Sequence, residues 1–131
     1  MKQTILLVDD ESDMVEMIAF NLREAGYRVL TAGRGGEAIQ LALSEQPDLI
    51  VLDLMLPEMD GFGVCEYLRR QPTTATTPII MLTAWANEQS RLLGFELGAD
   101  DYVTKPFSPR ELVLRISRRL ASRALEPQRS A

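Results

Sequence analysis

Five short apolar runs, each followed by a segment with helical spacing, constrain the fold of this chain more than any other feature. Because parallel strands need crossover helices, this alternation predicts a doubly wound α/β fold, a five-stranded parallel sheet with helices on both faces. The nearly continuous apolar character of the runs fits strands that are buried on both sides. The predicted strands cover residues 5–8, 28–31, 49–52, 79–82 and 101–104, and the predicted helices cover residues 13–25, 36–45, 61–70, 87–97 and 109–122.

Charged residues stand directly after three of the predicted strands. Asp9 and Asp10 follow the first strand, Asp53 follows the third, and Lys105 follows the fifth. In an open parallel sheet, the ligand site lies at the carboxyl ends of the strands, so these side chains are expected to converge. Crowded carboxylates repel one another unless a cation lies among them, and hard oxygen ligands suit Mg²⁺. The sequence therefore predicts a pocket for a metal ion and an anion.

Each of these groups also has a plainer interpretation. Asp9 and Asp10 suit an acidic helix start, and Asp53 suits a turn at a strand end. A lone aspartate that closes a buried strand is costly, however, unless it is paired or coordinated. Lys105 is one of only two lysines, and a compact ammonium suits a single anion oxygen better than the fork of arginine does. The shared position at strand ends favours one common pocket.

Thr83 follows the fourth strand, so its hydroxyl lies at the same edge of the sheet, where it can donate to a phosphoryl oxygen or cap a turn. Together the strand-end motifs resemble the receiver domain of bacterial two-component response regulators over about residues 3–121. The resemblance implies the flavodoxin-like (βα)5 receiver fold. The residues that carry it are Asp9-Asp10, Asp53 within Leu49-Ile50-Val51-Leu52-Asp53-Leu54-Met55-Leu56-Pro57, Thr83-Ala84 and Lys105-Pro106-Phe107.

The resemblance implies that Asp53 accepts a phosphoryl group from a sensor histidine kinase, with its carboxylate as the nucleophile. It assigns Mg²⁺, or Mn²⁺ in its place, to Asp10, Asp53 and the main-chain carbonyl of Met55, and Asp9 assists through water. Lys105 is expected to pair with the phosphoryl oxygens. Such a protein is not a conventional metabolic enzyme, because it catalyses its own phosphotransfer and autodephosphorylation.

The resemblance also assigns a switch to Thr83 and Tyr102. Phosphorylation adds charge and three acceptor oxygens, so Thr83 can be drawn inward and leave room for Tyr102 to swing in. Trp85, two residues beyond Thr83, is bulky enough to shield the phosphoryl group from water. The bond between Lys105 and Pro106 is expected to be cis, which only a proline makes physically plausible.

Spare apolar residues on the fourth and fifth predicted helices, rimmed by charge, predict a self-association surface. The segment 98–112 resembles the OmpR/PhoB branch, whose active receivers form two-fold dimers through the fourth helix, fifth strand and fifth helix. Carried over by position, Arg91 meets Glu111 and Asp101 meets Arg115 across the dimer. The full predicted surface is Arg91, Leu92, Phe95, Asp100, Asp101, Glu111, Leu114 and Arg115.

The net charge of −5 is unevenly distributed. Residues 1–104 carry seven basic and seventeen acidic side chains, whereas residues 105–131 carry seven basic and two acidic ones. The basic end suits either a solvated helix face or pairing with an acidic surface of a second copy. Nucleic acid is a poor partner, because the basic stretch is short and the domain is acidic. Ser122 stands where the branch often has an arginine, which Arg118, Arg119 or Arg123 can replace.

A length of 131 residues with 46% hydrophobic residues suits one domain. We expect the receiver to cover residues 1–122 and residues 123–131 to form a tail or the start of a linker. The N-terminus lacks the features of a signal peptide, and no apolar run is long enough to span a bilayer, so we expect a cytoplasmic protein without membrane contact. Cys65 forms no internal disulfide and is expected to be buried.

Two other classes share the predicted fold. A flavin-binding electron carrier needs a phosphate cradle after the first strand, where Asp9-Asp10-Glu11 would repel phosphate. A phosphatase of the haloacid-dehalogenase type wants a second aspartate two residues beyond the nucleophile, where Met55 stands. The output is open between two forms. Either an effector domain outside this chain binds DNA and regulates transcription, or a stand-alone receiver acts through protein contacts or a phosphorelay.

Overall fold

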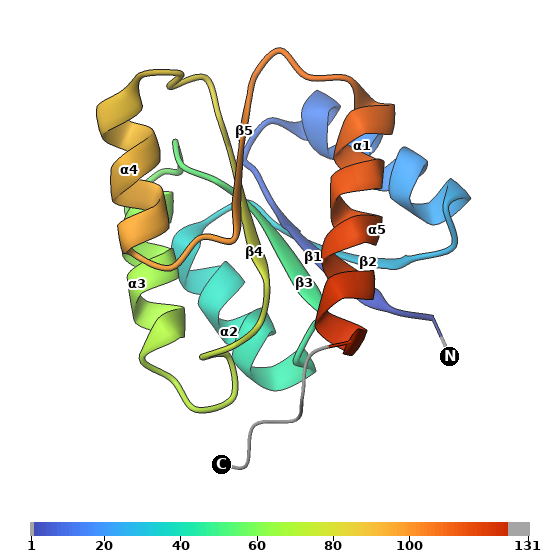
Figure 1. Ribbon diagram of the computed structural model, residues 1–131, viewed down its shortest axis with the longest axis horizontal. Helices are drawn as coiled ribbons and strands as arrows, with labels where there is room; N and C mark the ends of the chain where they lie inside the picture. Colours follow the sequence, from blue (N-terminus) through green and yellow to red (C-terminus); the bar gives the residue numbers. More distant parts are fainter. Residues whose placement is uncertain (1, 126–131) are drawn as a thin grey trace.

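The computed structural model describes residues 2–125, in which five strands and five helices alternate (Figure 1). Every predicted element is present, and all but one begin and end within one residue of the prediction. The strands are β1 (Thr4–Val8), β2 (Arg28–Ala32), β3 (Leu49–Asp53), β4 (Ile79–Thr83) and β5 (Asp101–Thr104). The helices are α1 (Ser12–Glu24), α2 (Gly35–Glu45), α3 (Gly61–Arg69), α4 (Glu88–Glu96) and α5 (Pro109–Leu125).

The exception is the end of α5, which continues past residue 122 to Leu125. Leu120 is buried against the sheet, and Arg123 donates a hydrogen bond of 2.8 Å to the carbonyl oxygen of Asp48. These contacts hold the last turn of the helix against the loop before β3. The predicted tail thus begins with helix, and its residues 126–131 lie outside the described residues.

The sheet is parallel throughout, with the strand order β2-β1-β3-β4-β5. Helices α1 and α5 cover one face, and α2, α3 and α4 cover the other (Figure 1). Alternate residues of a strand point to opposite faces. Accordingly, Leu6 and Val8 of β1 pack in the cluster beneath α2 and α3, whereas Ile5 and Leu7 pack in the cluster beneath α1 and α5. This doubly wound core confirms the predicted fold class.

Glycines with positive φ follow α1 and α4. Gly26 and Gly98 have φ values of +96° and +112°, a left-handed conformation that glycine adopts without a Cβ clash. The Ser108 hydroxyl accepts a bond of 3.4 Å from the Glu111 amide and caps α5. None of the helices in residues 2–125 is long and apolar enough to cross a membrane.

Candidate functional site

The carboxyl ends of β1, β3 and β5 bring three predicted side chains into direct contact. The ammonium nitrogen of Lys105 lies 3.1 Å from Asp53 Oδ2 and 3.4 Å from Asp9 Oδ2. Asp9 and Asp53 are buried, with 2% and 3% of their surface exposed, whereas Asp10 is exposed at the rim. One carboxylate oxygen from each aspartate lies within 4.8 Å of the others. The predicted convergence of these residues is therefore present.

Main-chain amides orient the two buried carboxylates. The amide of Met55 donates to Asp53 Oδ1 over 2.9 Å, and the amide of Glu11 donates to Asp9 Oδ1 over the same distance. Each aspartate thus turns one oxygen to the loop that follows its strand and the other oxygen to Lys105. These hydrogen bonds fix both buried carboxylates in place. None of them uses a carboxylate oxygen of the exposed Asp10.

Burial and mutual repulsion dominate the electrostatics of the pocket. Burial raises the pKa of Asp53 above its ordinary value of 3.8, and the charge of Asp9 raises it further, against the Met55 amide and Lys105. Burial acts to lower the pKa of Lys105, but hydrogen bonds and attraction from Asp53 and Asp9 outweigh it and leave that pKa raised. Two acids thus share one ammonium, which leaves the pocket with excess negative charge.

The start of α3 presses against the main chain of Asp53. A Cβ added at Gly61 would lie 2.5 Å from the carbonyl oxygen of Asp53 and 2.8 Å from the Cα of Leu54. Only glycine allows the helix to begin this close, and its amide donates to the carbonyl oxygen of Leu54 over 3.0 Å. These two contacts hold the start of α3 against the end of β3. They thereby fix both ends of the connecting loop, which contains Met55.

Thr83 and Tyr102 are joined through the main chain of Trp85. The Trp85 amide donates to Thr83 Oγ1 over 3.1 Å, and the Tyr102 hydroxyl donates to the Trp85 carbonyl oxygen over 2.7 Å. Thr83 is fully buried, and Tyr102 keeps 7% of its surface exposed; burial raises the pKa of its phenol. The Trp85 ring stacks on Phe62 of α3, with centroids 6.2 Å apart. Phe62 was not anticipated, because its sequence position carries no strand-end signal.

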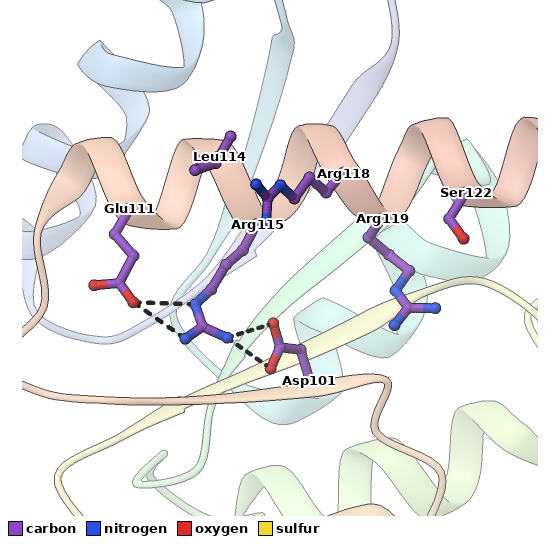
Figure 2. A pocket seen from close by; sticks show the side chains of 7 residues that line it. All are labelled: Asp101, Glu111, Leu114, Arg115, Arg118, Arg119 and Ser122. Carbon is purple, nitrogen blue, oxygen red and sulfur yellow. Dashed lines mark hydrogen bonds and ion pairs between the residues drawn. The ribbon is translucent and has the colours of Figure 1, made fainter.

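Part of the predicted self-association surface is exposed as expected. Leu92 and Leu114 expose 53% and 51% of their surface, and Phe95 exposes 43%. Beside Leu114 lies a cavity of about 460 Å³ between β5 and α5, shown in Figure 2. It is lined by Asp101, Glu111, Leu114, Arg115, Arg118, Arg119 and Ser122.

Within this cavity, Arg115 pairs with residues of its own chain. Its guanidinium donates to both carboxylate oxygens of Asp101 over 2.9–3.0 Å and to Glu111 over 3.1 Å (Figure 2). Asp100 also has internal partners, because its carboxylate accepts from Arg69 and from the amide of Ile79. The pairing of Arg115 across a dimer remains a prediction.

The residues of the pocket fit a Mg²⁺ ion. The donors are carboxylate oxygens within reach of one another, a hard set that this ion prefers, and nitrogen or sulfur ligands that would favour zinc are missing from the cluster. The surplus of negative charge around the single ammonium is a second reason for a cation to bind. Exposed Asp10 leaves the site open to solvent, as a partly hydrated ion needs.

Comparison with known proteins shows one consistent relationship. The family described as response regulator receiver domain matches residues 5–117. The alkaline phosphatase synthesis transcriptional regulatory protein PhoP of Bacillus subtilis is 53% identical over 116 residues, which are 88% of this chain and 48% of that protein. This chain spans about half the length of the curated relatives it matches.

Solved structures show the same relationship. A CheY-like response regulator receiver domain protein from Methanospirillum hungatei superposes with a TM-score of 0.91 at 28% identity, over 97% of this chain and 100% of that one. The chemotaxis protein CheY4 of Vibrio cholerae superposes with a TM-score of 0.86 at 34% identity, over 90% and 98% of the two chains.

Proposed function

The chain belongs to the response regulator receiver domain family, and from this membership we propose that it is a Mg²⁺-dependent switch phosphorylated on Asp53 by a sensor histidine kinase. The observation that carries the proposal is the contact of one partly buried ammonium, Lys105, with both Asp53 and Asp9, beside an exposed third carboxylate. A nucleophile, an anion partner and a cation site therefore occupy one strand-end pocket.

Transfer requires the carboxylate of Asp53 to attack phosphorus. As the new O–P bond forms, the P–N bond of the donor phosphohistidine breaks and its electron pair returns to the imidazole. The ammonium of Lys105 offsets the charge on the incoming phosphoryl oxygens, and the Met55 amide keeps the Asp53 carboxylate oriented. Hydrolysis later removes the phosphoryl group from Asp53, because water attacks phosphorus and the Asp53 carboxylate leaves.

Asp10, Asp53 and the main-chain carbonyl of Met55 would hold Mg²⁺, or Mn²⁺ in its place, with Asp9 assisting through water. When bound, the ion supplies positive charge that offsets the charge of the carboxylates and of the transferred phosphoryl group. Without it, the excess negative charge of the pocket would repel an anionic donor.

The readout is assigned to Thr83 and Tyr102. A phosphoryl group on Asp53 offers acceptor oxygens at the strand edge where the Thr83 hydroxyl lies. Turning that hydroxyl to the phosphoryl group would release the Trp85 amide, and the same residue holds the Tyr102 hydroxyl through its carbonyl. A change at Thr83 thus reaches Tyr102, and with it α4 and β5, through a single residue.

We further propose that the output is a two-fold dimer through α4, β5 and α5 that regulates transcription in the cytoplasm through a DNA-binding effector domain. The exposed side chains of Leu92, Phe95 and Leu114 support this surface. Dimerisation requires Arg115 to exchange its Asp101 partner for that of the second copy or to share both. A relative named as a transcriptional regulatory protein is about twice as long as this chain, which supports an effector outside it.

A stand-alone receiver that acts through protein contacts or a phosphorelay is the second candidate. It is favoured by the match to the chemotaxis protein CheY4, of which 98% is covered by this chain. The coding sequence that follows Ala131 in the natural gene separates the two. A winged-helix domain there supports the transcriptional output, and an immediate stop codon contradicts it.

The phosphoacceptor is tested by intact-mass measurement after incubation with acetyl phosphate and Mg²⁺. Wild-type protein is expected to gain one phosphoryl group, and neither Asp53→Ala nor a sample with the metal chelated should gain it. Asp13→Asn is the matched control, because Asp13 is an exposed acid on α1 outside the pocket, and it should gain the group normally. A wild-type protein that gains nothing from several donors contradicts the proposal.

A further inference from the structure

We propose that Arg69 fixes the C-terminal end of α4, so that a change at Tyr102 makes α4 pivot about that end rather than shift as a whole. The trigger of this motion rests on the proposed phosphorylation switch. The fixed end rests only on contacts among residues of α3, α4 and the segments beside them.

Arg69 is the last residue of α3, and its guanidinium lies among acceptors from two other segments. It donates twice to the carbonyl oxygen of Gly98, over 2.7 and 3.0 Å, and to those of Thr74 and Thr77, over 3.2 and 2.7 Å. It also pairs with Asp100 over 3.1 Å, and its side chain is only 19% exposed. Bonds from a charged, sheltered donor are stronger than neutral ones. One side chain thus joins α3, the loop before β4 and the turn between α4 and β5.

The turn that follows α4 is shaped to receive Arg69. Gly98 has the left-handed φ of +112°, and a Cβ there would lie 2.8 Å from both Cγ and Nε of Arg69. Asp100 is held from a second side, because its Oδ2 also accepts from the amide of Ile79 over 2.9 Å. The main-chain amide of Asp100 in turn donates to the carbonyl oxygen of Ile79 over 2.8 Å. The turn is therefore tied to both Arg69 and the start of β4.

The rest of α4 has a much weaker hold. Of its nine residues, all of which the structure describes, Gly94 alone is buried. A Cβ at Gly94 would lie 2.8 Å from the Met81 sulfur and 3.2 Å from the Tyr102 ring, so the helix rests closely on these two side chains. The Phe95 ring also approaches the Tyr102 ring, with centroids 6.4 Å apart. The C-terminal part of α4 is thus supported by the ring that the proposed switch moves.

A helix with one fixed end and a movable support close to that end rotates about the fixed end, and its other end moves farthest. At 1.5 Å per residue, the nine residues of α4 span roughly 13 Å, so displacement grows from the Gly98 end to the Asn87 end. Such a pivot divides the proposed output surface into two parts. Arg91 and Leu92, toward the N-terminal end of α4, would respond to phosphorylation, whereas Asp100 would stay in place.

Amide hydrogen exchange by NMR tests the fixed end without any phosphodonor. In Arg69→Met, the amides of Leu97, Gly98 and Ala99, which close the last turn of α4, should exchange at least tenfold faster than in the wild type. Arg70→Met is the matched control, because Arg70, directly after α3, is exposed and pairs only weakly, over 3.9 Å, with Glu66 of α3. Exchange in this control should match the wild type.

Arg69→Lys keeps the positive charge but loses the forked guanidinium, so these amides should exchange faster than in the wild type and more slowly than in Arg69→Met. This conservative variant keeps the test valid if Arg69→Met folds poorly. Amides in the middle of α5, such as that of buried Ile116, report on global stability. Unchanged exchange at Gly98 in Arg69→Met, or an equal acceleration at Ile116, would overturn the fixed end.

Chemical shifts after addition of beryllofluoride and Mg²⁺, a mimic of the phosphoryl group, test the pivot. In the wild type, changes along α4 should be largest at Glu88–Arg91 and smallest at Leu97–Ala99, and in Arg69→Met they should spread to Ala99. A uniform profile, or one largest at Gly98, overturns the pivot. A spectrum without change, together with no phosphoryl gain in the mass measurement, contradicts the proposed function and its trigger, whereas the exchange measurement alone decides the fixed end.

Discussion

Replacing Gly61 by alanine should destabilise the protein, although alanine is normally the better helix residue. Gly61 lacks the positive φ that would demand glycine, so backbone freedom alone favours Ala by up to about 1 kcal/mol. The added Cβ, however, would meet the Asp53 carbonyl oxygen at 2.5 Å and the Leu54 Cα at 2.8 Å. Both are main-chain atoms and cannot rotate away. Overpacking costs about 1–3 kcal/mol, and a clash with fixed main-chain atoms lies in the upper part of that range, at about 2–3 kcal/mol. Subtracting the gain of about 1 kcal/mol leaves an expected net loss of about 1–2 kcal/mol.

Urea unfolding followed by circular dichroism measures this loss. With an m-value of about 2 kcal/mol/M, the midpoint should fall by roughly 0.5–1 M. Gly63→Ala is the matched control in the same helix, because a Cβ there meets nothing closer than 3.4 Å, and it should be neutral or slightly stabilising. Because the clash displaces the main chain of Asp53, phosphoryl uptake should also slow in Gly61→Ala but not in Gly63→Ala. Equal midpoints for the two variants would refute the reasoning.

Three further predictions concern charge and burial. Burial raises the folded-state pKa of Asp53 above 3.8, so the folded state binds its proton more tightly, and ionisation costs stability as pH rises from about 3.8 through the raised pKa. Asp53→Asn should therefore be more stable than the wild type at pH 7, with an advantage that shrinks toward pH 4; urea midpoints that differ equally at both pH values would contradict this. Mg²⁺ at 100 times its Kd should stabilise the wild type by about 2.7 kcal/mol in thermal melts, and Asp10→Asn, an exposed change, should lose most of that gain; equal gains would remove Asp10 from the metal site. Burial raises the pKa of the Cys65 thiol to about 11, so iodoacetamide at pH 8 should label the native protein far more slowly than the urea-unfolded protein, and equal rates by mass measurement would contradict the buried position.

The sequence predicts the pocket well because its members follow strands, and parallel strands end at one edge. Once the alternation of strand and helix is recognised, the convergence of Asp9, Asp53 and Lys105 follows from topology. The end of α5 is less predictable, because its last turn depends on the bond from Arg123 to the carbonyl of Asp48, 75 residues away in sequence. Long-range contacts to main-chain groups leave no periodic pattern in a sequence.

The same limit applies to Arg69 and Phe62, which the sequence does not single out. Arg69 and exposed Arg70 are neighbours of the same residue type, and only the fold shows that one of them meets the carbonyl of Gly98. Arg115 shows the complementary limit. The resemblance to a dimer-forming branch names Asp101 as its partner, and the structure finds that pair within one chain. Position along the sequence identifies the pair but not the molecule to which each member belongs.

The link between Thr83 and Tyr102 uses the amide and the carbonyl of residue 85, and neither bond involves the indole ring. Every residue except proline offers the same two groups. The side chain at this position can therefore vary without disconnecting input from output. In the proposed switch, transmission therefore runs through the backbone, and the tryptophan adds a separate property, its stacking on Phe62, that can be altered independently. A library of substitutions at position 85 would accordingly yield receivers that differ in kinetics while sharing one relay.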